Sequence, residues 1–189
     1  HDRAGDLVPI GPSARNLNVA DYLVTLTSGP RQGGSGPPPD YIDQLDTWTE
    51  AGLLTGAPRA REAPRVPSAY LANTGSLTDR ARAYLDVNCA HCHNPQGPGH
   101  TSGLDLSWGQ TDPALWGVMK RPVAAGRASG GFAFAIEPGH PERSILVHRM
   151  QSTDPGVMMP ELGRQLVDER GVALMREWIA NMEADGGAR

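Results

Sequence analysis

Aromatic residues are scarce in this chain: two Phe, four Trp and four Tyr stand among 189 residues, and only 39% of all residues are hydrophobic. A core built from side chains alone would be thin at this length. Glycine and proline are abundant by contrast, with 23 and 17 residues, but they follow no short repeat of the collagen type. We therefore expect a loop-rich globular protein whose core is completed by something other than side chains.

Further absences narrow the class of protein. The 17 basic and 21 acidic residues are interleaved and give a net charge of -4, so no basic stripe is present for a nucleic acid. No apolar run reaches the roughly 18 residues that a transmembrane helix needs. The first residues, HDRAGDLVPIG, lack the regions of a signal peptide, so we expect a mature or trimmed chain. The only two cysteines, Cys89 and Cys92, exclude a disulfide framework of the small secreted type.

Helical periodicity is clearest in two segments. Thr78 is a suitable N-cap for a helix of about ten residues that runs directly into Cys89. Its apolar face carries Ala81, Tyr84, Leu85 and Asn88. Asp168 can cap a second helix, which ends before Gly186. Its apolar stripe carries Val172, Met175, Ile179 and Met182, with Trp178 beside them.

Two shorter helices have a weaker pattern. One is expected to begin at Pro141, a good first-turn residue, and to carry Ile145, Leu146 and Met150. The other is expected to be capped by Asp40, to carry Ile42, Leu45 and Trp48, and to close at Gly52 in a conformation with positive φ.

Segments 30–40 and 57–69 are rich in Pro, Gly and Ser, so we expect a linker or surface crossing without regular structure in each. We place a domain boundary between Gly56 and Ala69. Residues 1–69 are then a smaller, irregular N-terminal segment with one helix. Residues 70–185 form one compact, mostly α domain.

The most informative stretch, Cys89-Ala90-His91-Cys92-His93, has the spacing C-x-x-C-H. This spacing attaches haem covalently, because two thiols add to the two vinyl groups of the macrocycle and the next side chain meets the iron. The preceding helix would place the thioethers at one edge of the ring and the imidazole of His93 at one axial position. We expect the other ring nitrogen of His93 to donate to a backbone carbonyl in the loop 95–104.

Other uses of the two cysteines are conceivable. A thioredoxin-like dithiol would need the strands of a βαβ unit around it, and the pattern predicts none there. A structural zinc site would need about four ligands, while only Cys89, Cys92 and a nearby histidine are at hand. We favour haem and retain a zinc-stabilised interaction module as an alternative.

The sixth iron ligand must come from far along the chain, because the C-x-x-C-H loop occupies one wall of the pocket. Met158 and Met159 lie in the loop GVMMPELG directly before the predicted C-terminal helix, where a thioether would face the iron opposite His93. Pro160 stiffens this loop. The remaining methionines are expected to fill core space: Met119, Met150, Met175 and Met182.

Together these residues resemble the class I-like c-type cytochromes, in which a helix leads into C-x-x-C-H and a Met-Pro loop leads into a C-terminal helix. The resemblance implies a cytochrome c-like helical domain around a covalent haem. In that family the ligand is usually the methionine just before the proline, which is Met159 here. Met158 is the next choice. His100, His140 and His148 follow, and for these three we prefer surface or capping roles.

A closer resemblance rests on RARAYLDVNCAHCHNPQG, SGLDL, PGHPERSILVHRM and DPGVMMPELG. These segments look like the C-terminal cytochrome domain of large exported bacterial proteins that often carry two haem motifs. The resemblance covers roughly residues 77–182 and, weakly, 9–18. In such proteins the weak segment follows another C-x-x-C-H, whose histidine would fall near His1. No cysteine precedes His1. A second haem would thus require a chain truncated before His1, and we favour a terminal histidine without a ligand role.

The glycine-rich segment GRASGGFAF, residues 126–134, is a poor candidate for a phosphate cradle, because no strand precedes it and no helix follows. Phe132 and Phe134 alternate as in a short strand. We expect them in ordinary core, with cover of a haem edge as the alternative.

The sequence therefore predicts electron transfer by one haem c with His93 and Met159 as axial ligands. Two protein ligands leave no open coordination position. The alternative is the haem domain of a peroxidase or other oxidoreductase, in which the methionine would be absent or displaceable. The resemblance implies a bacterial periplasm or another extracytoplasmic location, and a redox partner protein or membrane complex.

Overall fold

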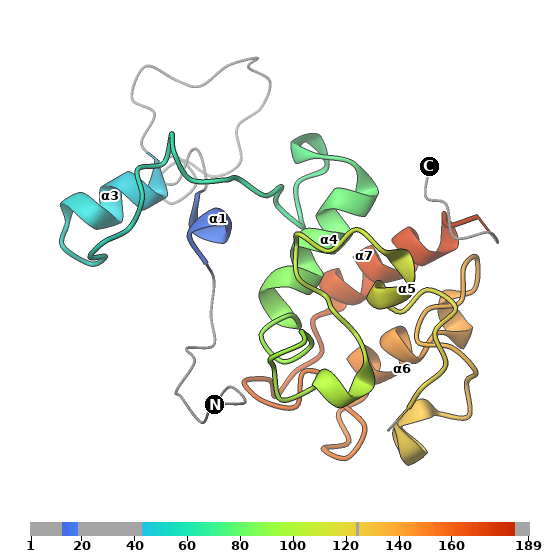
Figure 1. Cartoon of the computed structure of the whole chain (residues 1–189). Helices are drawn as coiled ribbons and strands as arrows, with labels where there is room; N and C mark the ends of the chain where they lie inside the picture. The colour runs from blue at the N-terminus through green and yellow to red at the C-terminus, as the bar shows by residue number, and fades with distance from the viewer. Residues whose placement is uncertain (1–12, 19–42, 124, 184–189) are drawn as a thin grey trace. The chain divides into compact units, whose positions relative to one another are not determined.

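The computed structural model describes residues 13–18, 43–123 and 125–183, and these residues divide into two compact units between Val66 and Pro67. Residues 13–18 and 43–66 belong to the N-terminal unit, and residues 67–123 and 125–183 belong to the larger C-terminal unit. Figure 1 shows the helices of each unit. His1, and the segment 30–40 that was expected to be a linker, lie outside the described residues.

The N-terminal unit contains α1 (Ala14–Leu17) and α3 (Gln44–Glu50). The predicted cap of the second helix, Asp40, lies outside the described residues, as does Ile42. The helix begins later than predicted, because the carboxylate of Asp43 accepts a hydrogen bond from the Leu45 N–H at 3.1 Å. Leu45 is buried and Gly52 has a φ of 71°, as predicted.

Polar contacts hold the rest of this unit together. The buried side chain of Asn18 donates to the carbonyl oxygens of Ala60 and Ala63, both at 2.9 Å. Arg65 donates to Asn18 Oδ1 at 3.0 Å and forms an ion pair with Asp43 at 2.8 Å. Segment 57–69 contains neither helix nor strand, as predicted, and its part within this unit is fixed by these hydrogen bonds.

The C-terminal unit is mostly α, as predicted. Its helices are α4 (Leu77–Asn88), α5 (Pro113–Trp116), α6 (Ile145–Gln151) and α7 (Glu169–Ala180). The described residues of this unit also form four short 3-10 helices, one before α4 and three in the loops between the α-helices: Ala72–Thr74, His100–Ser102, Gly126–Ser129 and Pro141–Arg143. The described residues form no sheet, and β pairing among them is limited to the isolated bridges Val118–Ile136 and Phe134–Ser144. Across the same residues, no helix has both the length and the apolar character needed to cross a membrane.

Helix α4 begins two residues earlier than the predicted cap would place it. Its N-cap is Ser76 and not Thr78, because Ser76 Oγ accepts from the Asp79 N–H at 3.1 Å and donates to the Asp79 carboxylate at 2.7 Å. This is a reciprocal capping arrangement. Thr78 instead accepts a hydrogen bond from the indole of Trp178 at 3.3 Å. Ala81, Tyr84 and Leu85 are buried as predicted, and Asn88 is partly exposed.

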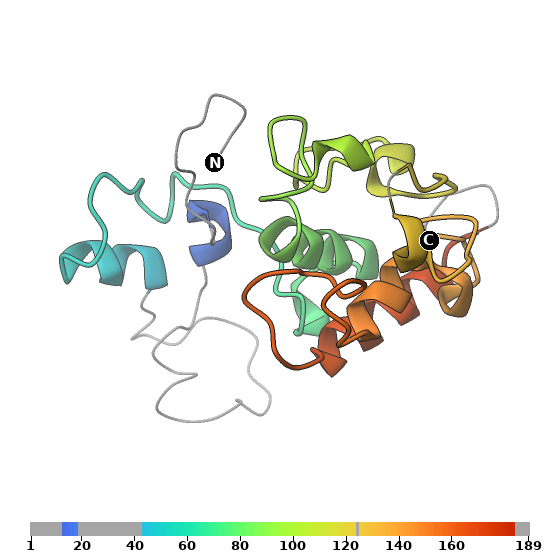
Figure 2. The same ribbon diagram turned by 90° about the horizontal axis from the view of Figure 1, so that it is seen from below.

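The core lies where α4 and α7 pack against each other, and α6 covers a further part of α7 (Figures 1 and 2). Leu85, Met175 and Ile179 are fully buried there, and Trp178 is 1% exposed. This packing fixes the end of α4, and therefore the position of the C-x-x-C-H segment that follows it.

The predicted helix from Pro141 to Met150 is two separate elements. A 3-10 turn ends at Arg143 and α6 starts at Ile145, with the fully buried Ser144 between them in an extended conformation. Ser144 Oγ donates to the His140 carbonyl at 3.0 Å and accepts from the Glu137 N–H at 2.9 Å. These bonds replace the helical hydrogen bonds at this point.

Helix α7 starts as predicted and ends earlier than predicted. Asp168 caps it by accepting from the Gly171 N–H at 3.0 Å. The helix closes at Ala180, and Asn181 is its C-cap, with a side chain that donates to the Glu177 carbonyl at 2.8 Å. Met182 is buried although it lies beyond the helix end.

Asp168 also joins two tyrosines to this helix end. Tyr70 donates to Asp168 Oδ2 at 2.7 Å and Tyr84 donates to the same oxygen at 3.0 Å. Burial, and then the neighbouring carboxylate, raises the pKa of Tyr70 to about 12. Partial burial opposes ionisation of Asp168, but the hydrogen bonds from Tyr70, Gly171 and Tyr84 lower its pKa overall.

Replacing Asp168 by alanine is expected to lower the free energy of unfolding by about 1–2 kcal/mol at neutral pH, because a cap and two phenol partners are lost. Asp168→Asn retains a capping oxygen, so it should lower the free energy of unfolding by less. A depressed carboxyl pKa stabilises the fold above the ordinary value and ceases to do so as the pH falls through the lowered one. The wild-type advantage over Asp168→Ala in urea unfolding should therefore shrink well below pH 3.8. An advantage independent of pH would contradict a role for the carboxylate charge.

Candidate cofactor site

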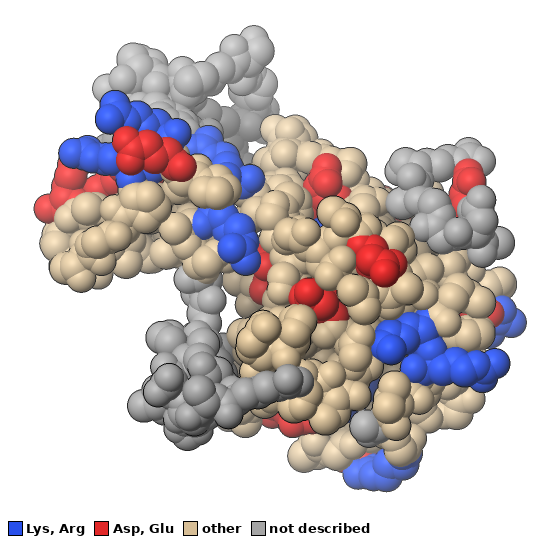
Figure 3. All heavy atoms as spheres, in the orientation of Figure 1, with Lys and Arg blue, Asp and Glu red and all other residues tan. Residues whose placement is uncertain are grey.

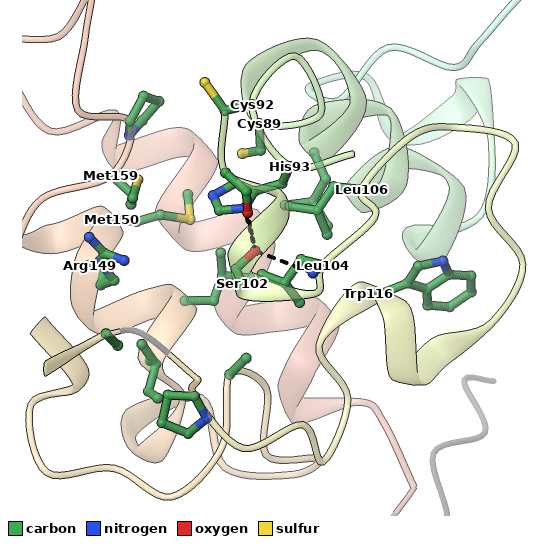
Figure 4. A pocket seen from close by; sticks show the side chains of 18 of the residues that line it. Cys89, Cys92, His93, Ser102, Leu104, Leu106, Trp116, Arg149, Met150 and Met159 are labelled. Atoms are coloured by element: carbon green, nitrogen blue, oxygen red, sulfur yellow. Dashed lines mark hydrogen bonds between the residues drawn. The ribbon is translucent and has the colours of Figure 1, made fainter. Parts of the chain in front are cut away.

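A cavity of about 470 Å³ opens in the C-terminal unit (Figure 4). Its walls come from the end of α4, the loop 89–106, the segment 116–123, one face of α6 and the turn 159–162. Cofactor and small-molecule sites have volumes of roughly 300–1,000 Å³. The apolar part of the wall includes Leu85, Leu104, Leu106, Ile136, Ile145 and Leu146.

Cys89 and Cys92 lie at one end of this cavity (Figure 4). Cys89 is the C-cap of α4, and its N–H donates to the Leu85 carbonyl at 2.9 Å. The chain then turns sharply, because the N–H groups of Cys92 and His93 both donate to the Cys89 carbonyl, at 3.1 and 2.9 Å. This turn brings both thiols and the imidazole to the same cavity.

Glycines allow the following loop to lie against this turn. The N–H of Gly99 donates to the Cys92 carbonyl at 2.9 Å. A Cβ on Gly99 would lie 3.0 Å from that oxygen and 3.0 Å from Nδ1 of His93, and a Cβ on Gly97 would collide with the same carbonyl. Side chains at these two positions would push the loop away from the imidazole.

The protonation of the thiols bears on one use of the cysteine pair, which is dithiol exchange. Burial, and then the charge of Cys92, raises the pKa of Cys89 to about 12. Burial also raises the pKa of Cys92, and the charge of Glu161 adds to this. Reactive dithiol motifs work through a thiolate whose pKa is lowered. The environment of these two thiols is therefore the opposite of what dithiol exchange needs.

The tautomer of His93 follows from its hydrogen bonds. Ser102 Oγ donates its proton to the Gly99 carbonyl at 2.6 Å, so it accepts from the His93 Nδ1–H at 3.0 Å. Burial, and then the positive charge of Arg149, lowers the pKa of His93. The ring is thus neutral at pH 7 with a free lone pair on Nε2. The prediction is a backbone carbonyl in the loop 95–104 as the partner. A backbone hydrogen bond to Gly99 in that loop does act on the ring and opposes the lowering of the His93 pKa. The Ser102 hydroxyl, which was not predicted, contacts Nδ1 as well.

Met159 reaches the cavity from the loop between α6 and α7 (Figure 4). Its N–H donates to the Arg149 carbonyl at 3.0 Å, and this bond ties it to α6. Met158 does not line the cavity, and its N–H donates to the Asp154 carbonyl at 2.8 Å. Cys89, Cys92, His93 and Met159, which are separated by up to 70 positions in the chain, therefore meet at one site.

A second thioether at the cavity was not anticipated. Met150 is buried in the core, as predicted, but it also lines the cavity, together with Leu146 and Arg149 of the same helix. Residues 145, 146, 149 and 150 share one helix face. The helical spacing of these residues can be recognised in the sequence, but no local sequence pattern indicates that this helix face borders a cavity.

Cations outnumber acids along the cavity wall. Lys120, the only lysine of the chain, lines it together with Arg121 and Arg149, and Glu161 supplies the single carboxylate among the described residues of the wall. Burial lowers the pKa of Arg149, and the attraction of Glu161, 3.9 Å away, opposes this. On the face of the molecule in Figure 3, by contrast, side chains of both signs are present, and at the upper left they lie next to one another. The cavity is therefore suited to an apolar ligand that carries negative groups.

Several other predicted candidates lie away from the cavity wall. His100 contacts the Gly97 carbonyl at 2.8 Å, His140 pairs with Glu142, and His148 packs against Phe132. Phe132 and Phe134 are partly exposed and do not belong to the hydrophobic core, so the expectation of ordinary core is wrong. Neither ring lines the cavity, so the alternative of covering a haem edge gains no support. Arg121 stacks over Phe134 instead.

No protein-family model, curated protein or solved structure matches this chain. Within the described ranges, no three side chains of His, Cys, Asp or Glu come together in a group that would hold a metal ion. The side-chain donors of a structural zinc site, about four in number, are thus not assembled around Cys89 and Cys92 there.

Proposed function

We propose that the C-terminal unit is a c-type cytochrome domain that transfers electrons through one covalently held haem. One observation carries this proposal: the two cysteines and the histidine of C-x-x-C-H line the same apolar cavity as Met159. Sequence spacing brings three of these residues together, but only folding brings the fourth. A cavity with thiols at one end, an imidazole with free Nε2, and a thioether from a distant loop has the donor set of a His/Met haem site.

Each residue has a distinct role in this proposal. Cys89 and Cys92 would hold the macrocycle, because the addition of each thiol across a vinyl group would form a C–S bond and place the thiol hydrogen on the neighbouring vinyl carbon. Nε2 of His93 and the sulfur of Met159 would be the two protein ligands of the iron. Lys120, Arg121 and Arg149 provide positive charge for the two carboxylates of the macrocycle. The haem, when bound, supplies one-electron exchange between ferrous and ferric iron.

The surrounding residues would act mainly by limiting water and holding the donors. Leu104, Leu106 and Ile136 line the cavity with apolar surface, which lowers the local dielectric constant. Ser102 holds the His93 ring in the tautomer needed for ligation. Two protein ligands would leave no open position for a substrate, and this favours a carrier over the haem domain of a peroxidase or another oxidoreductase.

The same proposal implies a cellular setting. Covalent haem of this kind is attached outside the cytoplasm in the resembling family, so we place the protein in a bacterial periplasm or another extracytoplasmic site. Its partners would be a redox protein or a membrane complex that delivers or accepts the electron. A zinc-stabilised interaction module is the remaining non-redox alternative, and metal analysis separates it from the cytochrome.

Haem is expected to stay with the polypeptide after acid-acetone extraction, because two thioether bonds resist this treatment. The intact mass should exceed the sequence mass by one haem, and two increments would indicate a second site. A matched Cys89→Ala, Cys92→Ala chain should contain no haem after the same treatment. Complete release from the wild type would contradict the proposal, and zinc in place of iron would favour the interaction module.

A further inference from the structure

The loop that carries Met159 has little regular structure of its own. It runs from the end of α6 at Gln151 to the start of α7 at Glu169. A thioether can serve as a lasting ligand only when its backbone is held in place, since the Met side chain is itself flexible. The hydrogen bonds of the Met159 backbone are therefore decisive.

Both backbone polar groups of Met159 are bonded. Its N–H donates to the Arg149 carbonyl at 3.0 Å, and its carbonyl accepts from Nη1 of Arg164 at 2.8 Å. The first bond ties Met159 to α6. The second ties it to a side chain five residues later in the same loop.

Arg164 makes two further bonds that connect this loop to the end of α6. Nη1 donates to the Met150 carbonyl at 2.6 Å, and Nη2 donates to the Ser152 carbonyl. Met150 lies in the last turn of α6 and Ser152 is its C-cap. One guanidinium therefore joins the end of α6 to Met159. The half-buried position of Arg164 strengthens these charge-assisted bonds relative to an exposed one.

We propose that Arg164 is the positioning residue of the axial methionine: by bridging Met159 to Met150 and Ser152, it keeps the Met159 thioether in the cavity. The inference rests on the proposed function. Arg suits this role because a planar guanidinium has five donors in a fixed fork, whereas a Lys ammonium has three donors at one point and cannot span three separate carbonyls.

Loss of Arg164 would leave the Met159 backbone with a single anchor on α6 and three carbonyls without their donor. The loop then spends part of its time with the thioether withdrawn from the cavity. An external ligand binds only this open form, so its apparent affinity rises in proportion to the open fraction. Hydrogen bonds from a charged group correspond to a shift on the order of tenfold to a hundredfold in such an equilibrium.

The test uses the holoprotein and imidazole as the external ligand. Arg164→Ala should weaken the absorption band of Met-to-ferric-iron ligation and tighten imidazole binding by about tenfold or more. Arg164→Lys should have a band intensity and an imidazole affinity between those of Arg164→Ala and the wild type. Met159→Leu removes the thioether, so its imidazole affinity is the reference value for a site that is always open. Arg61→Ala, in the N-terminal unit, removes an exposed arginine whose partner is its neighbour Glu62 and should change neither reading.

The outcomes separate the inference from the proposed function. A wild type with the Met band, together with an Arg164→Ala variant of unchanged band and imidazole affinity, overturns the positioning role alone. A wild type without covalent haem or without the Met band overturns the proposed function and this inference with it. If Arg164→Ala does not fold, Arg164→Lys decides, and wild-type behaviour of that variant in both readings overturns the role.

Discussion

A chain with both Cys89 and Cys92 replaced by alanine is expected to lack bound haem and to lose its cooperative unfolding transition. The fold has few aromatic residues, and the cavity of about 470 Å³ lies beside core residues of α4 and α6. Without the macrocycle, Leu85, Leu146 and Met150 would face an apolar void or water. Either arrangement forfeits the apolar contacts that the bound ring would provide.

The size of the effect follows from the volume. A void in an apolar core lowers the free energy of unfolding by about 24 cal/mol per Å³ when the surrounding side chains do not move to fill it. A cavity of about 470 Å³ therefore sets an upper bound on the order of 10 kcal/mol, which is comparable with the whole stability of a domain, roughly 5–15 kcal/mol. Even a third of that bound would lower the thermal midpoint by about 10 °C.

Circular dichroism during heating measures this directly. The single variants Cys89→Ala and Cys92→Ala each keep one thioether and serve as matched controls with intermediate stability. The wild type should melt in one sharp step and the double variant in a broad one, with loss of near-ultraviolet signal. A double variant without haem that melts like the wild type would show that the ring is not part of the core.

Much of this arrangement could be predicted from local patterns. The C-x-x-C-H spacing, the cap at Asp168 and the apolar stripe of α7 depend on residues close in sequence, and each is present where expected. The cap of α4 was misplaced although Ser76 and Asp79 have the right spacing for a reciprocal cap. Thr78 is an equally acceptable capping residue in isolation. Its contact with Trp178, 100 residues away, can be seen only in the fold.

The features that sequence reasoning missed depend on contacts that no local pattern indicates, even where the two partners are only four to nine residues apart in the chain. Arg164 has no distinguishing local pattern, because its acceptors are backbone carbonyls that every residue carries. Ser102 is likewise one of many serines until the loop folds it against His93. The break at Ser144 arises from buried bonds to His140 and Glu137 that override a favourable helical sequence. Pairings of this kind follow from packing and not from propensity.

Under the proposed haem function, Met159→His is expected to lower the reduction potential and to abolish the Met-to-iron absorption band. Thioether ligation favours the ferrous state and raises the potential relative to a nitrogen ligand. Axial ligands and their surroundings set haem potentials over about 0.8 V, and replacing the thioether by imidazole should account for a drop on the order of 0.1 V or more. Redox titration followed by absorption spectroscopy gives both readings from one sample.

Two neighbouring methionines provide the controls. Met158 lies one residue away but outside the cavity wall, and its backbone N–H is bonded to Asp154, so Met158→Leu should leave the potential and the band nearly unchanged. Met150 lines the cavity from α6 and is 4% exposed, so Met150→Leu tests the other thioether within reach. If Met150→Leu removes the band and Met159→His does not, the ligand comes from α6, and the loop that Arg164 holds serves only to close the cavity. If none of the three substitutions changes the potential or the band, the sixth ligand is not a methionine of this site. The haem domain of an oxidoreductase is then the better description.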